Sequence, residues 1–266
     1  MSATSAPLPT LDVSQTPAVP FGRLVSVELR KSFDTRAGRA YSLSVVGLCV
    51  VVMLVIALLF DEGFQDFSDF LLAMGGTLGF FLPIIPILLV TGEFGQRTGL
   101  VTFTLEPRRP RIVAAKLSAG LIISLGVLVL AAVIAAVGAV LASLRGFEVS
   151  WSLEYSQVQN FVLANLIGVL IGFALAMLLM NTPAAIVGYF VYSLIIPTVV
   201  GIIGAFVGWF QDLTPWIELN TAQTPLFTGD FRPSGEEWAQ LATASIIWLV
   251  VPLAFGILRL LRAEMK

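Results

Sequence analysis

Six long apolar stretches decide what this chain of 266 residues can fold into. Each has about the 20 residues or more that a helix needs to cross the hydrocarbon core of a bilayer. Only 12% of the residues are charged, whereas soluble domains carry about 25%. The sequence therefore predicts an all-α integral membrane protein with six transmembrane helices, at about 41–60, 70–91, 112–144, 158–180, 184–210 and 241–261.

The lysine and arginine residues predict which loops face the cytoplasm. Of the fifteen, five precede the first stretch, five lie between the second and the third, and three lie at or after the end of the sixth. Only Arg145 and Arg232 fall on the opposite side. Short cytoplasmic loops are enriched in these residues, so we expect both termini in the cytoplasm and the chain in the plasma or inner membrane.

The residues before the first span form two expected parts. Residues 1–20 are rich in Pro, Ser and Thr and contain no Lys or Arg, which predicts a disordered cytoplasmic tail. Residues 21–39 have an apolar side chain at every fourth position, namely Phe21, Val25, Leu29 and Phe33. This spacing predicts an amphipathic helix in the membrane interface, in contact with lipid; an ordinary lead-in to the first span is the alternative. The six-span domain then covers residues 40–266.

The densest basic segment, residues 92–116, lies between the second and third spans. One face of a short helix there would carry Phe94, Thr98, Val101 and Leu105. Glu93 and Arg97 would pair on another face, and Pro107 would end the helix. We expect Lys116, at the start of the third span, to reach toward the lipid headgroups. A loop that only fixes the topology is the alternative, with Glu93 a solvated charge at a helix end.

The sequence lacks the residues and motifs that are typical of several functional classes. No ionisable residue lies near the middle of a span, although ion-coupled transporters usually keep one there. No phosphate-binding loop is present. There is no histidine and only one cysteine, Cys49, so we expect neither catalytic residues nor a metal site. Nothing in the sequence predicts nucleic-acid binding, and any energy for transport would come from another chain.

A few polar and small residues within the spans are candidates for a substrate pathway or a dimer seam: Thr77, Asn165, Tyr189, Tyr192, Gly201, Gly204 and Gly208. The three glycines follow the small-residue spacing that lets membrane helices pack closely. Proline residues in the second, fifth and sixth spans predict kinks. The nearly charge-free interior favours an apolar or amphiphilic cargo, whereas a hydrophilic polymer would need a polar or aromatic lining. Buried polar residues that satisfy kinked backbone are the alternative to both.

The order of these features resembles the permease subunits of type 2 ATP-binding-cassette (ABC) exporters. The likeness covers roughly residues 21–262 and rests on three segments, "LVSVELRKSFDTRAGR", "GEFGQRTGLVTFTLEPRRPRIVAAK" and "LTPWIELNTAQTPLFTGDFRPSGEEW". In the second, the family pattern of an acid, a polar pair, an apolar stretch, Pro and basic residues falls on Glu93, Arg97, Thr98, Leu105, Pro107, Arg111 and Lys116. The third corresponds to short helices that dip into the outer leaflet in the family.

The resemblance implies a permease that holds no cofactor and has no enzymatic site of its own. Two ATP-binding subunits, which bind ATP and Mg²⁺, would pair with this chain and with a second copy or a sister permease. A coupling helix between spans two and three would dock on the ATPase through Glu93, Phe94, Arg97, Thr98, Val101, Leu105, Pro107 and Arg109. A connecting helix at the membrane surface would carry Phe21, Val25, Glu28, Leu29 and Phe33.

Two other classes compete with this interpretation. An ATP-independent channel, facilitator or scaffold would have the same spans and would work without an ATPase. An integral-membrane enzyme that acts on lipid is the third class, but the absence of histidine and of an acidic cluster speaks against it.

Overall fold

The computed structural model describes residues 19–60, 63–95, 106, 108–228 and 232–262. These residues are mostly helical and include no strand. Six helices among them are long and apolar enough to cross a membrane: Arg36–Leu59, Phe67–Glu93, Arg109–Leu144, Tyr155–Leu179, Thr182–Phe206 and Gly235–Arg262. The predicted all-α fold with six candidate spans is therefore confirmed. Each helix begins a few residues before its predicted stretch.

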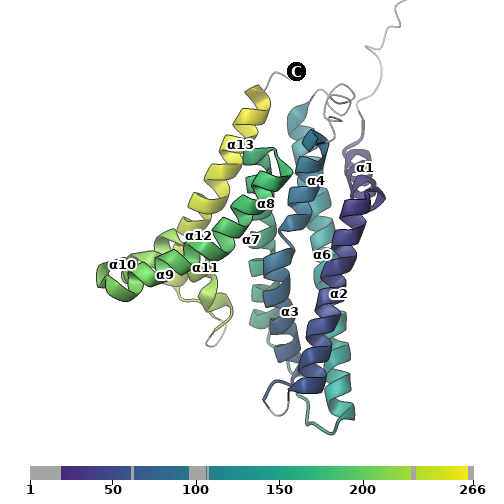
Figure 1. Cartoon of the computed structure of the whole chain (residues 1–266), viewed down its shortest axis with the longest axis vertical. Helices are drawn as coiled ribbons and strands as arrows, with labels where there is room; N and C mark the ends of the chain where they lie inside the picture. Colours follow the sequence, from purple (N-terminus) through teal and green to yellow (C-terminus); the bar gives the residue numbers. More distant parts are fainter. Residues whose placement is uncertain (1–18, 61–62, 96–105, 107, 229–231, 263–266) are drawn as a thin grey trace, which may run out of the picture.

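Several spans are divided into shorter elements, which Figure 1 labels. In chain order they are α1 (Phe21–Asp34), α2 (Arg36–Leu59), α3 (Phe67–Phe81), α4 (Ile84–Gly95), α6 (Arg109–Leu144), α7 (Tyr155–Leu179), α8 (Thr182–Phe190), η1 (Val191–Ile195), α9 (Ile196–Phe206), α10 (Gly208–Ile217), α11 (Leu219–Gln223), η2 (Thr224–Leu226), α12 (Gly235–Ser245), η3 (Ile246–Val250) and α13 (Val251–Arg262).

Proline residues account for these divisions. The second span breaks into α3 and α4 at Pro83, which lacks an amide donor for the preceding turn. In the fifth and sixth spans a π-helical turn, η1 or η3, ends just before Pro197 or Pro252. A wider turn is one way for a membrane helix to accommodate the carbonyl that proline leaves without a donor. The predicted irregularities thus occur in all three proline-containing spans.

Two helices organise the packing. α6, with 36 residues and a length of about 54 Å, packs against α1, α2 and α3. α7 packs against α4 and α13. Two apolar clusters result, one between α2, α3 and α6 and the other between α4, α7 and the C-terminal helices. α6 exceeds the bilayer core of about 30 Å, as its sequence predicts, so it must tilt or extend beyond the membrane.

The fifth and sixth spans diverge from this bundle, although α13 packs against α7. In Figure 1 the elements from α8 to α13 spread to one side of α7. Only 11% of the most apolar window of the fifth span is buried within the chain, against 56% in the second and fourth spans. Between these two spans α10, α11 and η2 form short helices, in the segment where the family resemblance implies them.

Both ends of the described chain lie at one end of the bundle. Arg111, near the start of α6, donates a hydrogen bond to the carbonyl of Val19 (2.6 Å). Arg109 donates to the carbonyl of Leu261 at the end of α13 (3.3 Å). The first described residues, the start of α6 and the end of α13 therefore meet, as an even number of spans requires. We call this end of the bundle the terminal end.

Candidate functional site

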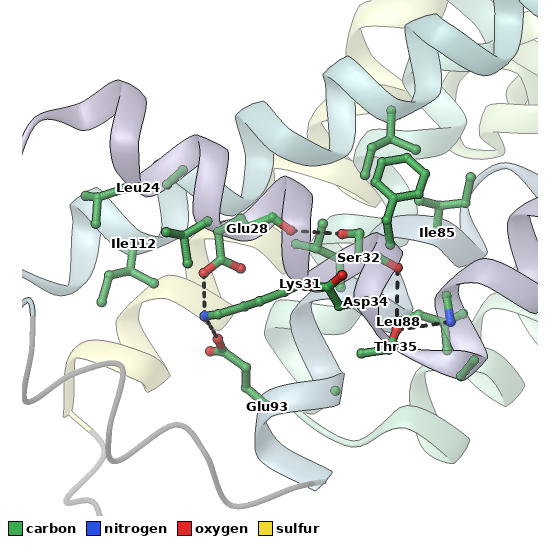
Figure 2. A pocket seen from close by; sticks show the side chains of 18 of the residues that line it. Leu24, Glu28, Lys31, Ser32, Asp34, Thr35, Ile85, Leu88, Glu93 and Ile112 are labelled. Atoms are coloured by element: carbon green, nitrogen blue, oxygen red, sulfur yellow. Dashed lines mark hydrogen bonds and ion pairs between the residues drawn. The ribbon is translucent and has the colours of Figure 1, made fainter.

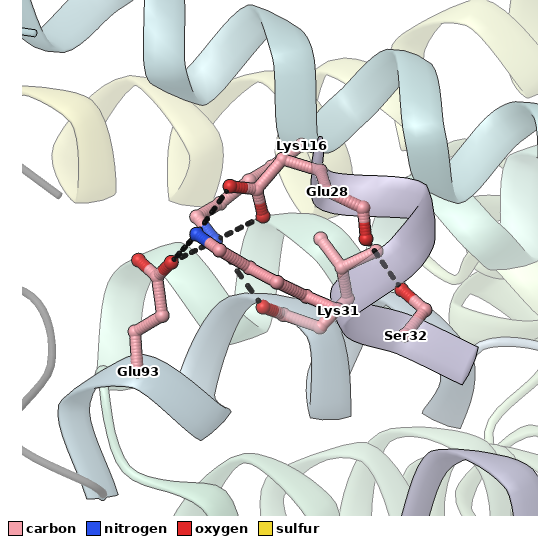
Figure 3. A network of polar contacts seen from close by, with 6 residues as sticks. Glu28, Lys31, Ser32, Glu93 and Lys116 are labelled. Carbon is pink, nitrogen blue, oxygen red and sulfur yellow. Dashed lines mark hydrogen bonds and ion pairs between the residues drawn. The ribbon is translucent and has the colours of Figure 1, made fainter. Parts of the chain in front are cut away.

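Four charged side chains meet at the terminal end, where α1, α4 and α6 come together. α1 contributes Glu28 and Lys31, α4 contributes Glu93 and α6 contributes Lys116. Figure 3 shows them pointing toward one another from these three helices. We call this group the ion ring, because each carboxylate touches both lysines and each lysine touches both carboxylates.

All four lysine–carboxylate pairs of the ring are within ion-pair distance. Lys116 Nζ lies 2.7 Å from Glu28 Oε2 and 3.1 Å from Glu93 Oε1. Lys31 Nζ lies 2.8 Å from Glu28 Oε1 and 2.6 Å from Glu93 Oε1. Two positive and two negative groups alternate, so the ring has no formal net charge.

The ring is buried, which raises the cost of breaking it. Glu28 and Lys116 are each 4% exposed and Glu93 is 8% exposed. A buried charge is tolerated only when it is paired, and removing one partner of a buried pair typically costs about 3–5 kcal/mol. The ring therefore fixes the relative positions of α1, α4 and α6.

Lys31 is the solvent-facing member, with 40% of its side chain exposed. Burial lowers the pKa of Lys31, but hydrogen bonds and charge interactions with Glu28 and Glu93 outweigh it. The pKa of Lys31 is therefore raised above its ordinary value. Lys31 remains positively charged at neutral pH and keeps the ring balanced.

Arginine residues hold the neighbouring chain segments at the terminal end. Glu106 accepts a hydrogen bond from Arg111 Nη1 (2.8 Å). Arg109 donates to carbonyls at the end of α13, and Arg259 donates to the carbonyl of Leu178 at the end of α7 (2.8 Å). Cations at helix C-termini are favourable because those carbonyls lack helical partners and carry partial negative charge. Glu106, like Glu93, is buried and paired rather than solvated.

A cavity of about 910 Å³ adjoins the ring. Its lining includes the charged residues Glu28, Lys31 and Glu93 and apolar side chains such as Leu24 and Ile85. Figure 2 shows these side chains around the space between α1 and the spans. Among the described residues no three His, Cys, Asp or Glu side chains gather to hold a metal ion, and the ring carboxylates are already neutralised by lysines.

The predicted coupling residues fall into three groups. Glu93 lies in the ion ring, and Arg109 contacts the end of α13. Phe94 belongs to the last turn of α4, but its side chain is outside the described part of the structure. The other predicted residues, Arg97, Thr98, Val101, Leu105 and Pro107, lie outside the described residues. The structure therefore places the two ends of the predicted coupling segment.

The predicted interfacial helix forms as α1, but its buried face differs from its apolar stripe. Phe21 is 43% exposed and Phe33 50% exposed, whereas Glu28 is buried. Val25 and Leu29 are half-buried. A helical stripe of large apolar residues usually marks the buried face, but here the ion ring turns Glu28 inward. The interface between membrane and water remains the predicted environment of Phe21 and Phe33.

Lys116 is where the sequence-based expectation was wrong. It does not extend toward headgroups, because α1 and α4 bring two carboxylates to its ammonium group. The partners are 88 and 23 residues away in the chain, so no local spacing indicates the ring. The available signal was the rarity of charge: Lys116 follows an apolar pair and begins a long apolar run.

Three of the predicted pathway residues come together in a second pocket. Asn165 of α7, Tyr189 of α8 and Tyr192 of η1 line a space of about 200 Å³. We call it the polar pocket. Thr77 is not among its lining residues; its hydroxyl donates to the carbonyl of Ala73 in its own helix (2.9 Å).

The predicted glycine row is not continuous. Gly201 and Gly204 lie on α9, but the chain turns at Val207, whose backbone is extended, and Gly208 begins α10. A Cβ at Gly204 would lie 3.7 Å from the Cα of Gln211, so α9 packs against α10 of the same chain there. The prediction that all three glycines lie along one helix and form a single packing seam is therefore wrong.

Comparison with known proteins assigns no family to the chain. No protein-family model matches the sequence, and no curated protein matches it.

Proposed function

We propose that this chain is the membrane-spanning permease subunit of an ATP-driven ABC exporter, with both termini in the cytoplasm. Two copies, or this chain and a sister permease, would form the substrate pathway. A separate ATPase would supply the energy. The proposal starts from the resemblance of three ordered sequence segments and from six candidate spans.

The observation that carries the proposal is the ion ring. α4 and α6 flank the predicted coupling segment, and α1 corresponds to the predicted connecting helix. The ring joins these three elements through four contacts of 2.6–3.1 Å. A force applied to the coupling segment would therefore reach α1 and two spans together, as rigid-body transmission from an ATPase requires.

Affinity purification of the tagged full chain from its native membranes tests the proposal. We expect a cytosolic ABC ATPase to co-purify in stoichiometric amounts. Leu105→Asp should lose the ATPase while the chain still inserts, because a charge would enter the predicted docking face. Leu105→Met is the matched control and should retain it. A stable, active chain without any ATPase partner would contradict the proposal and favour an ATP-independent channel, facilitator or scaffold.

A further inference from the structure

The polar pocket lies among four parts of the chain that are distant in sequence. α3, α7 and the α8–η1 segment surround it, and Asn220 and Gln223 of the α11 segment line it as well. Asn165 is the eleventh residue of its span, which places it about 15 Å along the helix from that end. The pocket thus lies well inside the span region, and the short helix α11 reaches it.

Two polar atoms of the pocket have no partner. Asn165 is 1% exposed and Tyr192 is 4% exposed. Asn165 Oδ1 and the Tyr192 hydroxyl nevertheless make no hydrogen bond within the described part of the chain. Leaving a buried polar group unsatisfied costs about 1–3 kcal/mol, so such groups are rare and need an explanation.

Other polar groups at the pocket do have hydrogen-bond partners. The Tyr189 hydroxyl lies 3.0 Å from the carbonyls of both Gly79 and Phe80, which can accept its hydrogen bond. The amide nitrogen of Asn165 donates to the carbonyl of Phe161 (2.8 Å). Among the described residues that line the pocket, the buried atoms without a partner are therefore one acceptor and one hydroxyl; Ser124 and Ser193 carry such hydroxyls outside this lining.

Glycine residues keep the space open. A Cβ added at Gly79 would lie 4.0 Å from Asn165 Oδ1, the unpartnered atom. A larger side chain at Gly79 would therefore enter the pocket, whereas Gly76 is exposed and a Cβ there would meet no described atom within 4 Å. Both glycines line it, and neither has the positive φ that would require glycine for backbone reasons.

A buried acid caps the start of α11, beside the pocket. Glu218 is 1% exposed and accepts hydrogen bonds from the backbone amides of Asn220 and Thr221 at 3.0 and 2.6 Å. It also accepts from both of their side chains at 2.8 and 2.7 Å. The pocket wall formed by α11 is therefore organised before any ligand arrives.

We propose that the polar pocket binds an uncharged, hydroxyl-bearing group, such as one sugar or polyol unit. Asn165 Oδ1 needs a donor, and a ligand hydroxyl supplies one. The Tyr192 hydroxyl can donate or accept in return. Among the described residues no charged side chain lines the pocket. The nearby Glu218 carboxylate is already satisfied by four hydrogen bonds, so a charged ligand would be left without compensation.

The size of the pocket limits the ligand to a small unit. About 200 Å³ is several times the roughly 30 Å³ that one water occupies in the liquid. It is also below the range of about 300–1,000 Å³ for drug-sized ligands. That this unit is part of the transported cargo rests on the proposed function; its binding to the chain does not.

Binding of glucose to the purified full chain, without any ATPase, tests the proposal. The Trp248 ring lies 5.2 Å from the Tyr192 ring, so tryptophan fluorescence reports on the pocket. We expect a saturable change with glucose. No response is expected with gluconate or glucosamine, which add a negative or a positive charge to a similar frame.

Asn165→Leu should weaken glucose binding by about tenfold or more, the factor expected for one lost hydrogen bond. Without sugar, this variant should melt at the same or a higher temperature. It removes an unsatisfied acceptor, and the Phe161 carbonyl that loses the amide donor still has its partner within α7. Gly79→Leu should abolish binding by filling the pocket. The matched control is Asn160→Leu: Asn160 is also buried, but it donates to the carbonyl of Leu226 (3.1 Å). That variant should melt lower and still respond to glucose.

The proposal is overturned by the absence of a saturable response, or by an equal response to the charged analogues. It is also overturned if Asn165→Leu lowers the melting temperature and leaves glucose binding intact, because Asn165 then has a structural role. These outcomes are independent of ATPase co-purification, so either proposal can fail while the other holds.

Discussion

The ion ring and the polar pocket both bury polar groups in an apolar chain, yet they do so in opposite ways. In the ring every charged group has two partners of opposite sign. In the pocket one amide oxygen and one hydroxyl have none. A fully satisfied network stabilises one arrangement, whereas unsatisfied groups are tolerated where a ligand completes them. This difference fits the two proposals, that the ring transmits force from the coupling segment to the spans and that the pocket binds a hydroxyl-bearing ligand.

The largest expected effect comes from removing the most buried cation of the ring. Lys116→Met leaves Glu28 and Glu93 to share Lys31, so one buried negative charge loses its balance. We expect the free energy of unfolding to fall by about 3–5 kcal/mol, as measured by denaturation in lipid or detergent. Arg39→Met, on the exposed side of α2, is the control and should change it by less than about 0.5 kcal/mol. Equal stability of the two variants would contradict the structural role of the ring.

A second variant restores charge balance without restoring the ring. Adding Glu28→Gln to Lys116→Met removes one adjacent ion pair and leaves the Lys31–Glu93 pair (2.6 Å). We expect about 0.5–3 kcal/mol of the stability to return, which is the usual range for directly coupled residues. A double-mutant cycle on the same unfolding measurement gives this value. Strict additivity would show that the two side chains act independently.

Two tyrosines sharpen the contrast within the pocket. Tyr189→Phe loses a hydrogen bond to backbone carbonyls and should cost about 1 kcal/mol. Tyr192→Phe removes a hydroxyl that has no partner among the described residues, so the unliganded chain should be as stable as wild type or more stable, by up to about 1–3 kcal/mol. Thermal unfolding of the two variants side by side checks this order. The reverse order would mean that Tyr192 makes the more important contact in the folded chain.

The smallest expected effect is at the exposed edge of the ring. Lys31→Met also leaves two carboxylates to share one lysine, but it should cost only about 0–1 kcal/mol, because truncating this half-exposed side chain lets water reach the carboxylates that it paired. The pKa of Lys31 is raised in the folded state. Its contribution to the free energy of unfolding is therefore complete at neutral pH and is lost as the pH rises through the folded-state pKa. The difference between wild type and Lys31→Met should therefore shrink at strongly alkaline pH. A difference that grows with pH would contradict the assigned shift.

The sequence predicted those parts of the structure that depend on local patterns. Apolar runs gave the six candidate spans, and the prolines indicated where three of them become irregular. The α1 helix also followed from local spacing. Its inward-facing acid did not, because Glu28 is buried only when α6 brings Lys116 beside it.

Long-range contacts account for what the sequence did not predict. The sequence allowed Glu93 to be a solvated charge at a helix end. In the structure α1 and α6 cover it and supply its lysine partners. The glycine row looked continuous because spacing alone cannot show that the chain turns at Val207. In contrast, Asn165, Tyr189 and Tyr192 were selected only as polar residues in spans. Their meeting in one pocket depends on the packing of α7 against α8.

The central claim is that the ring carries movement of the coupling segment into the spans, and two charge-balanced variants test it directly. Glu93→Gln with Lys31→Gln detaches α4 and leaves Glu28 paired with Lys116. Glu28→Gln with Lys31→Gln keeps α4 joined to α6 through Glu93 and Lys116 (3.1 Å). The measurement is ATP turnover by the complex purified through a tag on this chain. We predict a several-fold loss in the first variant and a smaller loss in the second; equal turnover in both would contradict the claim.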